Sequence, residues 1–176
     1  MNLYTMPSAT HIGHANLKVA DMDRALAFYR DVLGFRVRAT PRGGEMVVLG
    51  ASERSLDLAL TALSGGSPPP SNCTGLDHLA LRFPSRRELA RAYRRLSECG
   101  IALTEATDYG PNVSLYCADP DGNGIELYWQ APWKKDNRLP SNCLPNTSQW
   151  IWPVCLLRLM HQNPLLPKNP EYREAG

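Results

Sequence analysis

Apolar and polar positions along the chain repeat one pattern twice. In each copy, a segment of alternating residues is followed by apolar residues at helical spacing, and then by three more alternating segments. The expected helices begin after Asp21 and after Ser85. The expected strands cover residues 12–19, 35–40, 45–50 and 55–62 in the first copy, and 76–83, 101–104, 113–118 and 124–129 in the second. The pattern therefore predicts two βαβββ modules, at residues 12–62 and 76–130.

The spacing of chemically distinctive residues supports an internal repeat. His14 and His78 each precede a predicted helix cap by seven residues, and segment 58–60 falls on segment 125–127. A module of about 50 residues is too small to fold alone, so two are expected to pair. We predict an α+β fold in which the modules form one curved mixed sheet around a concave cavity, with the helices on the outer face.

Two stretches lie outside the repeat. Residues 63–75 are rich in Ser, Gly and Pro, which is typical of a linker. Residues 131–176 hold seven of the fifteen prolines and show no periodicity, so we expect an irregular tail. The predicted domain therefore covers residues 12–130.

Composition limits the kinds of partner. A net charge of +2, with 20% charged and 43% apolar residues, favours neither nucleic acid nor an anionic membrane. Five cysteines without a C-x-x-C pair argue against a disulfide framework and indicate a reducing compartment. The N-terminus lacks the layout of a signal peptide. We expect a cytoplasmic protein that binds a small molecule and can form a homodimer.

One carboxylate interrupts an apolar strand near the end of the second module. Residues 119–122 (DPDG) predict a tight turn, in which glycine takes the corner that needs positive φ. In the strand that follows, Ile125 and Leu127 point one way, whereas Glu126 and Tyr128 point the other. Considered alone, Glu126 could belong to a solvated outer face.

Strand parity places two histidines on the same predicted face as Glu126. His14 and His78 both lie opposite the helix-facing residues of their strands and occupy equivalent positions of the repeat. Two histidines and one carboxylate match the facial ligand set that suits Fe(II) or another first-row divalent metal. The alternative is that both are surface or hydrogen-bonded core residues. His11 has the opposite parity and no repeat counterpart, and His161 lies in the tail.

Three motifs resemble the vicinal oxygen chelate superfamily of glyoxalase I, bleomycin- and fosfomycin-resistance proteins and type I extradiol dioxygenases. They are residues 14–35 (HANLKVADMDRALAFYRDVLGF), 76–81 (LDHLAL) and 119–128 (DPDGNGIELY). The resemblance implies paired βαβββ modules and a divalent metal held by His14, His78 and Glu126. Fe(II) is the first expectation, with Mn, Ni or Zn as alternatives.

Departures from the family motifs bear on the reaction. Glyoxalase I proteins have a second carboxylate where this chain has Ala59, which disfavours that activity, although Asp57 on the same face could partly compensate. Three ligands with open positions look more like the catechol-cleaving dioxygenases. Tyr116 matches a tyrosine that those enzymes place beside the substrate oxygen, and Tyr109-Gly110 lies where they commonly have His-Gly.

The resemblance leaves the proton transfer unassigned. Extradiol enzymes tend to have an acid–base histidine just before the run at residues 57–60, where this chain has Ser55 and Leu56. We therefore expect a metal-dependent dioxygenase-like enzyme with Tyr116 as a catalytic residue. Asp57, Tyr109 and Tyr128 are candidate substrate-binding residues. The alternatives are a lyase or isomerase of the glyoxalase type and a non-enzymatic binding protein of the bleomycin-resistance type.

The tail also differs from the family. Its members often end in an Asp-Leu-x-x-Leu-Leu helix, whereas residues 150–155 read WIWPVC. With suitable third bases, a shifted reading of those codons gives Asp-Leu-Ala-Ser-Leu. We hypothesise a frameshift after Gln130, which resequencing of the gene would test.

Overall fold

The computed structural model describes residues 3–41, 43–68, 70 and 72–132. The chain divides into two compact units, Met1–Cys73 and Thr74–Gly176, and each is described by itself. Most of the predicted tail, from residue 133 onward, lies outside the described residues, as does the frameshift hypothesis for residues 150–155. Among the residues described, no helix is long and apolar enough to span a membrane.

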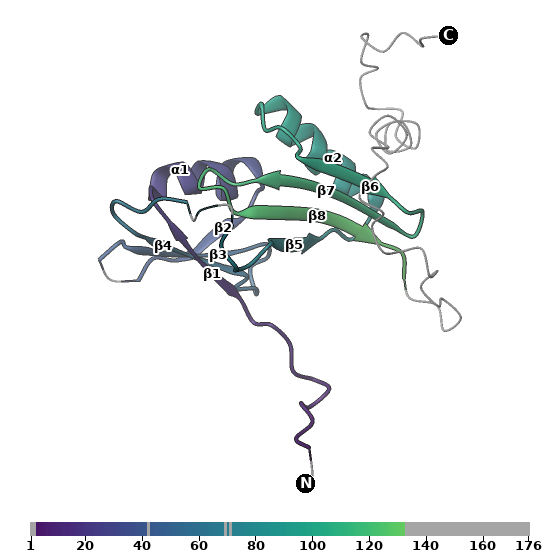
Figure 1. The fold of residues 1–176 in the computed structure, drawn as a ribbon, viewed down its shortest axis with the longest axis horizontal. Helices are drawn as coiled ribbons and strands as arrows, with labels where there is room; N and C mark the ends of the chain where they lie inside the picture. Colours follow the sequence, from purple (N-terminus) through teal and green to yellow (C-terminus); the bar gives the residue numbers. More distant parts are fainter. Residues whose placement is uncertain (1–2, 42, 69, 71, 133–176) are drawn as a thin grey trace. The chain divides into compact units, whose positions relative to one another are not determined.

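The first unit contains the predicted βαβββ module (Figure 1, purple to blue). Its elements are β1 (Ala15–Val19), α1 (Met22–Leu26), the π-helical segment η1 (Ala27–Val32), β2 (Arg36–Ala39), β3 (Met46–Gly50) and β4 (Leu58–Ala62). The strand order is β1-β4-β3-β2, with β1 parallel to β4 and the other pairs antiparallel. Asp21 caps α1 as predicted, because its Oδ1 accepts the Arg24 N–H at 2.9 Å.

The second unit repeats this arrangement (Figure 1, teal to green). Its elements are β5 (His78–Arg82), α2 (Arg86–Glu98), β6 (Glu105–Asp108), β7 (Asn112–Ala118) and β8 (Gly124–Gln130). The strand order β5-β8-β7-β6 is the order of the first unit, again with one parallel pair. Ser85 caps α2 by accepting the Glu88 N–H at 3.2 Å. The α+β fold and the internal repeat are thus confirmed.

Strand register aligns the repeat residue by residue. Asn16 of β1 stands opposite Ala59 of β4, and Ala80 of β5 stands opposite Glu126 of β8. Ala59 and Glu126 are therefore equivalent positions, as the sequence count predicted. Each unit has its own four-stranded sheet. The joining of the two sheets around a metal-containing cavity stays a prediction.

Each helix covers one face of its own sheet, since α1 contacts β4 and α2 contacts β8. Strand residues predicted to face α2 are buried on β7 and β8, namely Val113, Leu115, Ile125 and Leu127, and they pack with the buried Leu89 and Leu96 of α2. On β5 the predicted helix-facing residues Leu79 and Leu81 are half-buried. Fully burying one such side chain contributes about 1.5–3 kcal/mol. The predicted parity of β8 therefore holds, and Glu126 and Tyr128 lie on the face away from α2.

The predicted strand at residues 101–104 is wrong. Gly100, at φ +71°, ends α2 in a Schellman motif, in which the N–H of Ile101 bonds to Leu96 O at 2.9 Å and the N–H of Gly100 to Ser97 O at 3.0 Å. Ile101 thus closes the helix rather than joining a ladder. The strand, β6, begins only at Glu105.

Candidate metal centre

A buried carboxylate shapes the turn that leads into β8. Asp119 Oδ1 accepts the backbone N–H groups of Asp121 at 2.9 Å and Asn123 at 2.8 Å, and its Oδ2 accepts the Asn123 side-chain amide at 2.9 Å. Gly122 has φ +85°, as the turn pattern predicts. These bonds fix the start of the strand that carries Glu126.

Gly124 is the first residue of β8, at the start of the predicted strand, and packs closely against β5. Gly124 stands opposite His78 in the parallel pairing of β8 with β5. A Cβ at Gly124 would come within 2.4 Å of Asp77 O and 3.0 Å of His78 Cβ. Glycine is needed because the two backbones approach so closely.

Three of the predicted site residues lie together on the face of the second sheet that α2 leaves free. His78 Nε2 is 3.3 Å from Glu126 Oε2, and the Tyr116 O–H donates to Glu126 Oε1 at 2.9 Å. The His78 and Tyr116 rings meet edge to face, with centroids 5.5 Å apart. The Glu126 side chain is 12% exposed and that of His78 is 33% exposed. One carboxylate oxygen is therefore held by Tyr116 and the other faces the histidine.

The Tyr116 phenol is a hydrogen-bond donor in this setting. Burial raises the pKa of Tyr116 to about 12, and the hydrogen bond to Glu126 and its negative charge act in the same direction. The phenol consequently keeps its proton throughout the neutral pH range. It can orient Glu126 or donate a proton to a neighbouring oxygen.

A second carboxylate contacts the other nitrogen of His78. Asp77 Oδ2 lies 2.6 Å from His78 Nδ1. Asp77 is not among the predicted site residues, although its place directly before a candidate ligand histidine is a signal for it in the sequence.

The donor set of the second unit fits a divalent cation. His78 Nε2 and Glu126 Oε2, 3.3 Å apart, are a nitrogen and an oxygen donor close enough to hold one divalent cation together. Within the described part of the chain, no group of three or more His, Cys, Asp or Glu side chains is gathered for metal binding. His14 is an exposed residue just before β1 in the first unit. Its role as third ligand stays a prediction.

Two positions of the first unit bear on whether it can supply a second carboxylate ligand, and they differ in side chain and burial. Ala59 is a buried residue in the middle of β4. Asp57, just before that strand, is half-buried and accepts the Ala51 backbone N–H at 2.7 Å through its Oδ2. This bond ties the Asp57 carboxylate to the loop that follows β3.

An arginine that the sequence analysis did not select holds the turn between β6 and β7, where Tyr109 is exposed. Arg86, the first residue of α2, donates to Gly110 O, lies 3.6 Å from Asp108 Oδ2 and stacks 4.6 Å from the centre of the Trp129 ring. Asp108 Oδ1 in turn accepts the Gly110 N–H at 2.7 Å. Arg86 of α2 thus fixes the backbone conformation of the turn that carries Tyr109.

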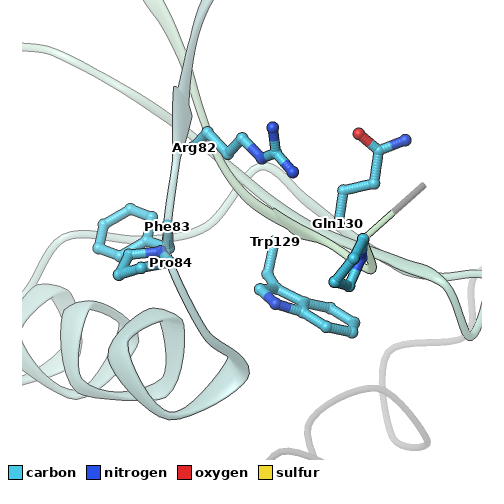
Figure 2. Close-up of a pocket in the computed structure, with 6 residues that line it drawn as sticks. Arg82, Phe83, Pro84, Trp129 and Gln130 are labelled. Carbon is cyan, nitrogen blue, oxygen red and sulfur yellow. The ribbon is translucent and has the colours of Figure 1, made fainter.

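A separate hollow of about 260 Å³ lies where β5 and β8 end (Figure 2). Its lining residues are Arg82, Phe83, Pro84, Trp129, Gln130 and Pro132. Tyr128 pairs with Arg82 across the strands but is not part of this lining. None of the predicted site residues lines the hollow.

The chain also matches a family by sequence. Residues 11–127 match the model of the Glyoxalase/Bleomycin resistance protein/Dioxygenase superfamily. The chain belongs to this superfamily. The predicted resemblance is therefore confirmed over both modules.

Proteins similar to this chain are named for several different activities. It is 40% identical over 131 residues to a catechol-2,3-dioxygenase of Bacillus subtilis (strain 168), covering 72% of this chain and 45% of that protein. It is 32% identical to biphenyl-2,3-diol 1,2-dioxygenase 3 of Rhodococcus globerulus, covering 69% of this chain and 64% of that protein. It is 30% identical to a lactoylglutathione lyase of Haemophilus influenzae, covering 65% and 88%. The chain thus spans less than two thirds of both dioxygenases.

Solved structures agree on the fold. A glyoxalase/dioxygenase from Nostoc punctiforme superposes with a TM-score of 0.65 at 23% identity, covering 75% of this chain and 99% of that one. A glyoxylase/bleomycin resistance protein/dioxygenase domain from Frankia sp. EAN1pec gives a TM-score of 0.60 at 25% identity, covering 70% and 99%.

Proposed function

We propose that this protein is a divalent-metal-dependent enzyme of the extradiol dioxygenase type, acting on a small aromatic substrate with two adjacent oxygens. The observation that carries the proposal is the contact of His78 Nε2 with Glu126 Oε2 at 3.3 Å, beside the Tyr116 hydroxyl. Two donors of different chemistry converge there, and a proton-bearing group stands next to them.

His14, His78 and Glu126 are the proposed ligands. A divalent metal there, Fe(II) first and Mn, Ni or Zn as alternatives, would act as a Lewis acid that chelates the two substrate oxygens. Glu126 would hold the metal through Oε2, because Oε1 already accepts the Tyr116 O–H. Ala59, at the position equivalent to Glu126, supplies no further ligand, which leaves room for a bidentate substrate.

Tyr116 is the proposed proton-handling residue. Its phenol is protonated at neutral pH and already donates a hydrogen bond within the site. Ser55 and Leu56 stand where extradiol enzymes tend to have an acid–base histidine, so this chain needs another group near the substrate oxygen. Tyr116 can keep a hydrogen bond to that oxygen or donate its proton to it.

Asp57, Tyr109 and Tyr128 are proposed to contact the substrate. Tyr128 lies two residues beyond Glu126 on the same face of β8, so its ring can pack against an aromatic substrate. Tyr109 sits on the turn held by Arg86, which suits a residue that positions a ligand. Asp57 is the least free of the three, because its carboxylate already bonds to Ala51.

A lyase or isomerase of the glyoxalase type is the second candidate. The similarity to a lactoylglutathione lyase supports it. The bond between Asp57 and Ala51, together with Ala59 at the equivalent of Glu126, leaves that reaction without a second carboxylate ligand. A metal-free binding protein of the bleomycin-resistance type is disfavoured, because those proteins generally lack the three residues proposed here as ligands.

Oxygen consumption separates these candidates. Protein loaded with Fe(II) under anaerobic conditions is mixed with a panel of catechols in air-saturated buffer, and oxygen uptake and ring-cleavage products are followed together. We expect uptake with at least one catechol, matched one to one by product. Metal-loaded protein that consumes no oxygen with any catechol would favour the lyase or isomerase. A matched sample of the His14→Ala variant controls for free iron.

A further inference from the structure

His78 lies between two carboxylates of unequal proximity. Its Nδ1 is 2.6 Å from Asp77 Oδ2, and its Nε2 is 3.3 Å from Glu126 Oε2. The contact with Asp77 has the length of a short hydrogen bond, whereas the contact with Glu126 is slightly longer than the usual range. The two ring nitrogens are therefore not equivalent.

The unequal contacts of the two ring nitrogens favour one tautomer of a neutral His78. A neutral histidine carries one ring proton, and an ionised carboxylate can only accept a hydrogen bond. The shorter contact places the proton on Nδ1, where Asp77 accepts it, and leaves the lone pair on Nε2 facing Glu126. Metal-binding histidines in proteins commonly donate their other N–H to a carboxylate in this way, which fixes both the tautomer and the ring orientation.

We propose that Asp77 is a positioning residue of the metal centre, which holds the His78 ring so that Nε2 faces the cation shared with Glu126. This inference rests on the proposed metal site and adds a residue that acts through His78. Gly124 supports the arrangement, because the absence of a Cβ lets β8 lie directly against the Asp77–His78 backbone.

A carboxylate directly before the candidate ligand histidine occurs only in the second of the two predicted modules. Gly13 holds the position equivalent to Asp77 and has no side chain, so His14 has no such partner from the preceding residue. The Asp77 side chain is 94% exposed, and water competes with its hydrogen bond. We therefore expect an effect on metal affinity of about tenfold, the low end for a residue that orients a metal ligand.

The first test needs no metal. Long-range ¹H–¹⁵N NMR of the histidine rings in the metal-free full chain, at a pH where His78 is neutral, reports which nitrogen carries the proton. We expect His78 to be the Nδ1–H tautomer in the wild type and to revert toward the Nε2–H tautomer of free histidine in Asp77→Ala. An Nε2–H tautomer in the wild type, or no change in the variant, overturns the proposal.

The second test measures Zn(II) affinity by chelator competition in the same full-length proteins. We expect a loss of about tenfold in Asp77→Ala and about threefold in Asp77→Asn, which keeps an acceptor oxygen. Glu98→Gln, which removes an exposed charge from the end of α2, should stay within twofold. Equal losses in the Ala and Asn variants would show a charge effect without orientation and would contradict the proposal. Wild-type protein that binds no Zn(II) would refute the proposed metal site and with it the role of Asp77 there, whereas Zn(II) binding with an unchanged affinity in Asp77→Ala would refute the role of Asp77 alone.

Discussion

Gly124 and His78 stand opposite each other in the parallel pairing of β8 with β5, with no room for a Cβ between the strands. This close approach brings the strand that carries Glu126 against the strand that begins with His78. The separation of the two proposed ligands therefore depends on a residue that contributes no side chain.

Substituting Gly124 should disturb the site from the backbone. In Gly124→Ala the new methyl group would lie 2.4 Å from Asp77 O, so the strands must shift. We expect a loss of about 1–3 kcal/mol in unfolding free energy, typical of overpacking, and weaker metal binding. Urea denaturation and metal affinity measure the two effects. Gly75→Ala is the matched control, since nothing lies within 4 Å of a Cβ there. Equal behaviour of the two variants would contradict the close-packing argument.

Tyr116→Phe should separate metal binding from turnover. The phenol bonds to Glu126 Oε1 and not to the oxygen that faces His78, so the variant should retain its metal content. Loss of the proton-bearing group should lower kcat by about a hundredfold or more, in the range of general acid–base effects. Metal analysis and steady-state kinetics are compared on the same preparation. A variant with unchanged kcat would remove Tyr116 from the proposed proton transfer.

The turn before β8 should be a large source of stability. The Asp119 carboxylate is buried and accepts three hydrogen bonds. Asp119→Ala would leave those donors without their acceptor, at a cost of about 2–4 kcal/mol. The free energy of unfolding in urea measures this cost, with the exposed Glu98→Ala as the control. A change below about 0.5 kcal/mol would show that the turn forms without the carboxylate.

Cys117 should react slowly and affect stability at high pH. Burial, and secondarily the charge of Asp119, raises the pKa of Cys117 to about 11. An unfolded thiol has a pKa of about 8.5. The folded state therefore favours the protonated thiol, and this contribution to stability is complete below pH 8.5 and is lost as the pH rises toward 11. Peptide-resolved alkylation at pH 8 should modify the exposed Cys73 well before Cys117. Equal rates would contradict the burial of Cys117.

The fold could be predicted because it repeats. The equal spacing of His14 and His78 from their helix caps defined the modules, and the observed pairing of Ala59 and Glu126 with equivalent partners follows the same count. Because side chains alternate between the two faces of a strand, the apolar positions then indicated which face of each sheet is buried. The prediction failed at residues 101–104, where the apolar residue after Gly100 closes a helix instead of extending a sheet.

The placement of Tyr116 and Glu126 on one face was predictable from the sequence, whereas the contacts that support this face were not. Parity placed Tyr116 and Glu126 on one face, and the structure shows them hydrogen-bonded. The contacts of Asp77 and Arg86 depend on side-chain orientation, which a periodic pattern does not encode. The tight approach at Gly124 likewise depends on the separation of two strands that are distant in sequence.

The metal content of ligand variants tests the central claim most directly. Wild type, His14→Ala, His78→Ala and Glu126→Ala are loaded with Fe(II), desalted anaerobically and analysed by mass spectrometry for metal per chain. His11→Ala is the control, because His11 is exposed and its Nδ1 contacts only its neighbour Ala9 among the described residues. We expect about one metal per chain in wild type and His11→Ala, and a loss of most of it in the other three. Equal metal in wild type and His14→Ala would contradict a site held by His14, His78 and Glu126.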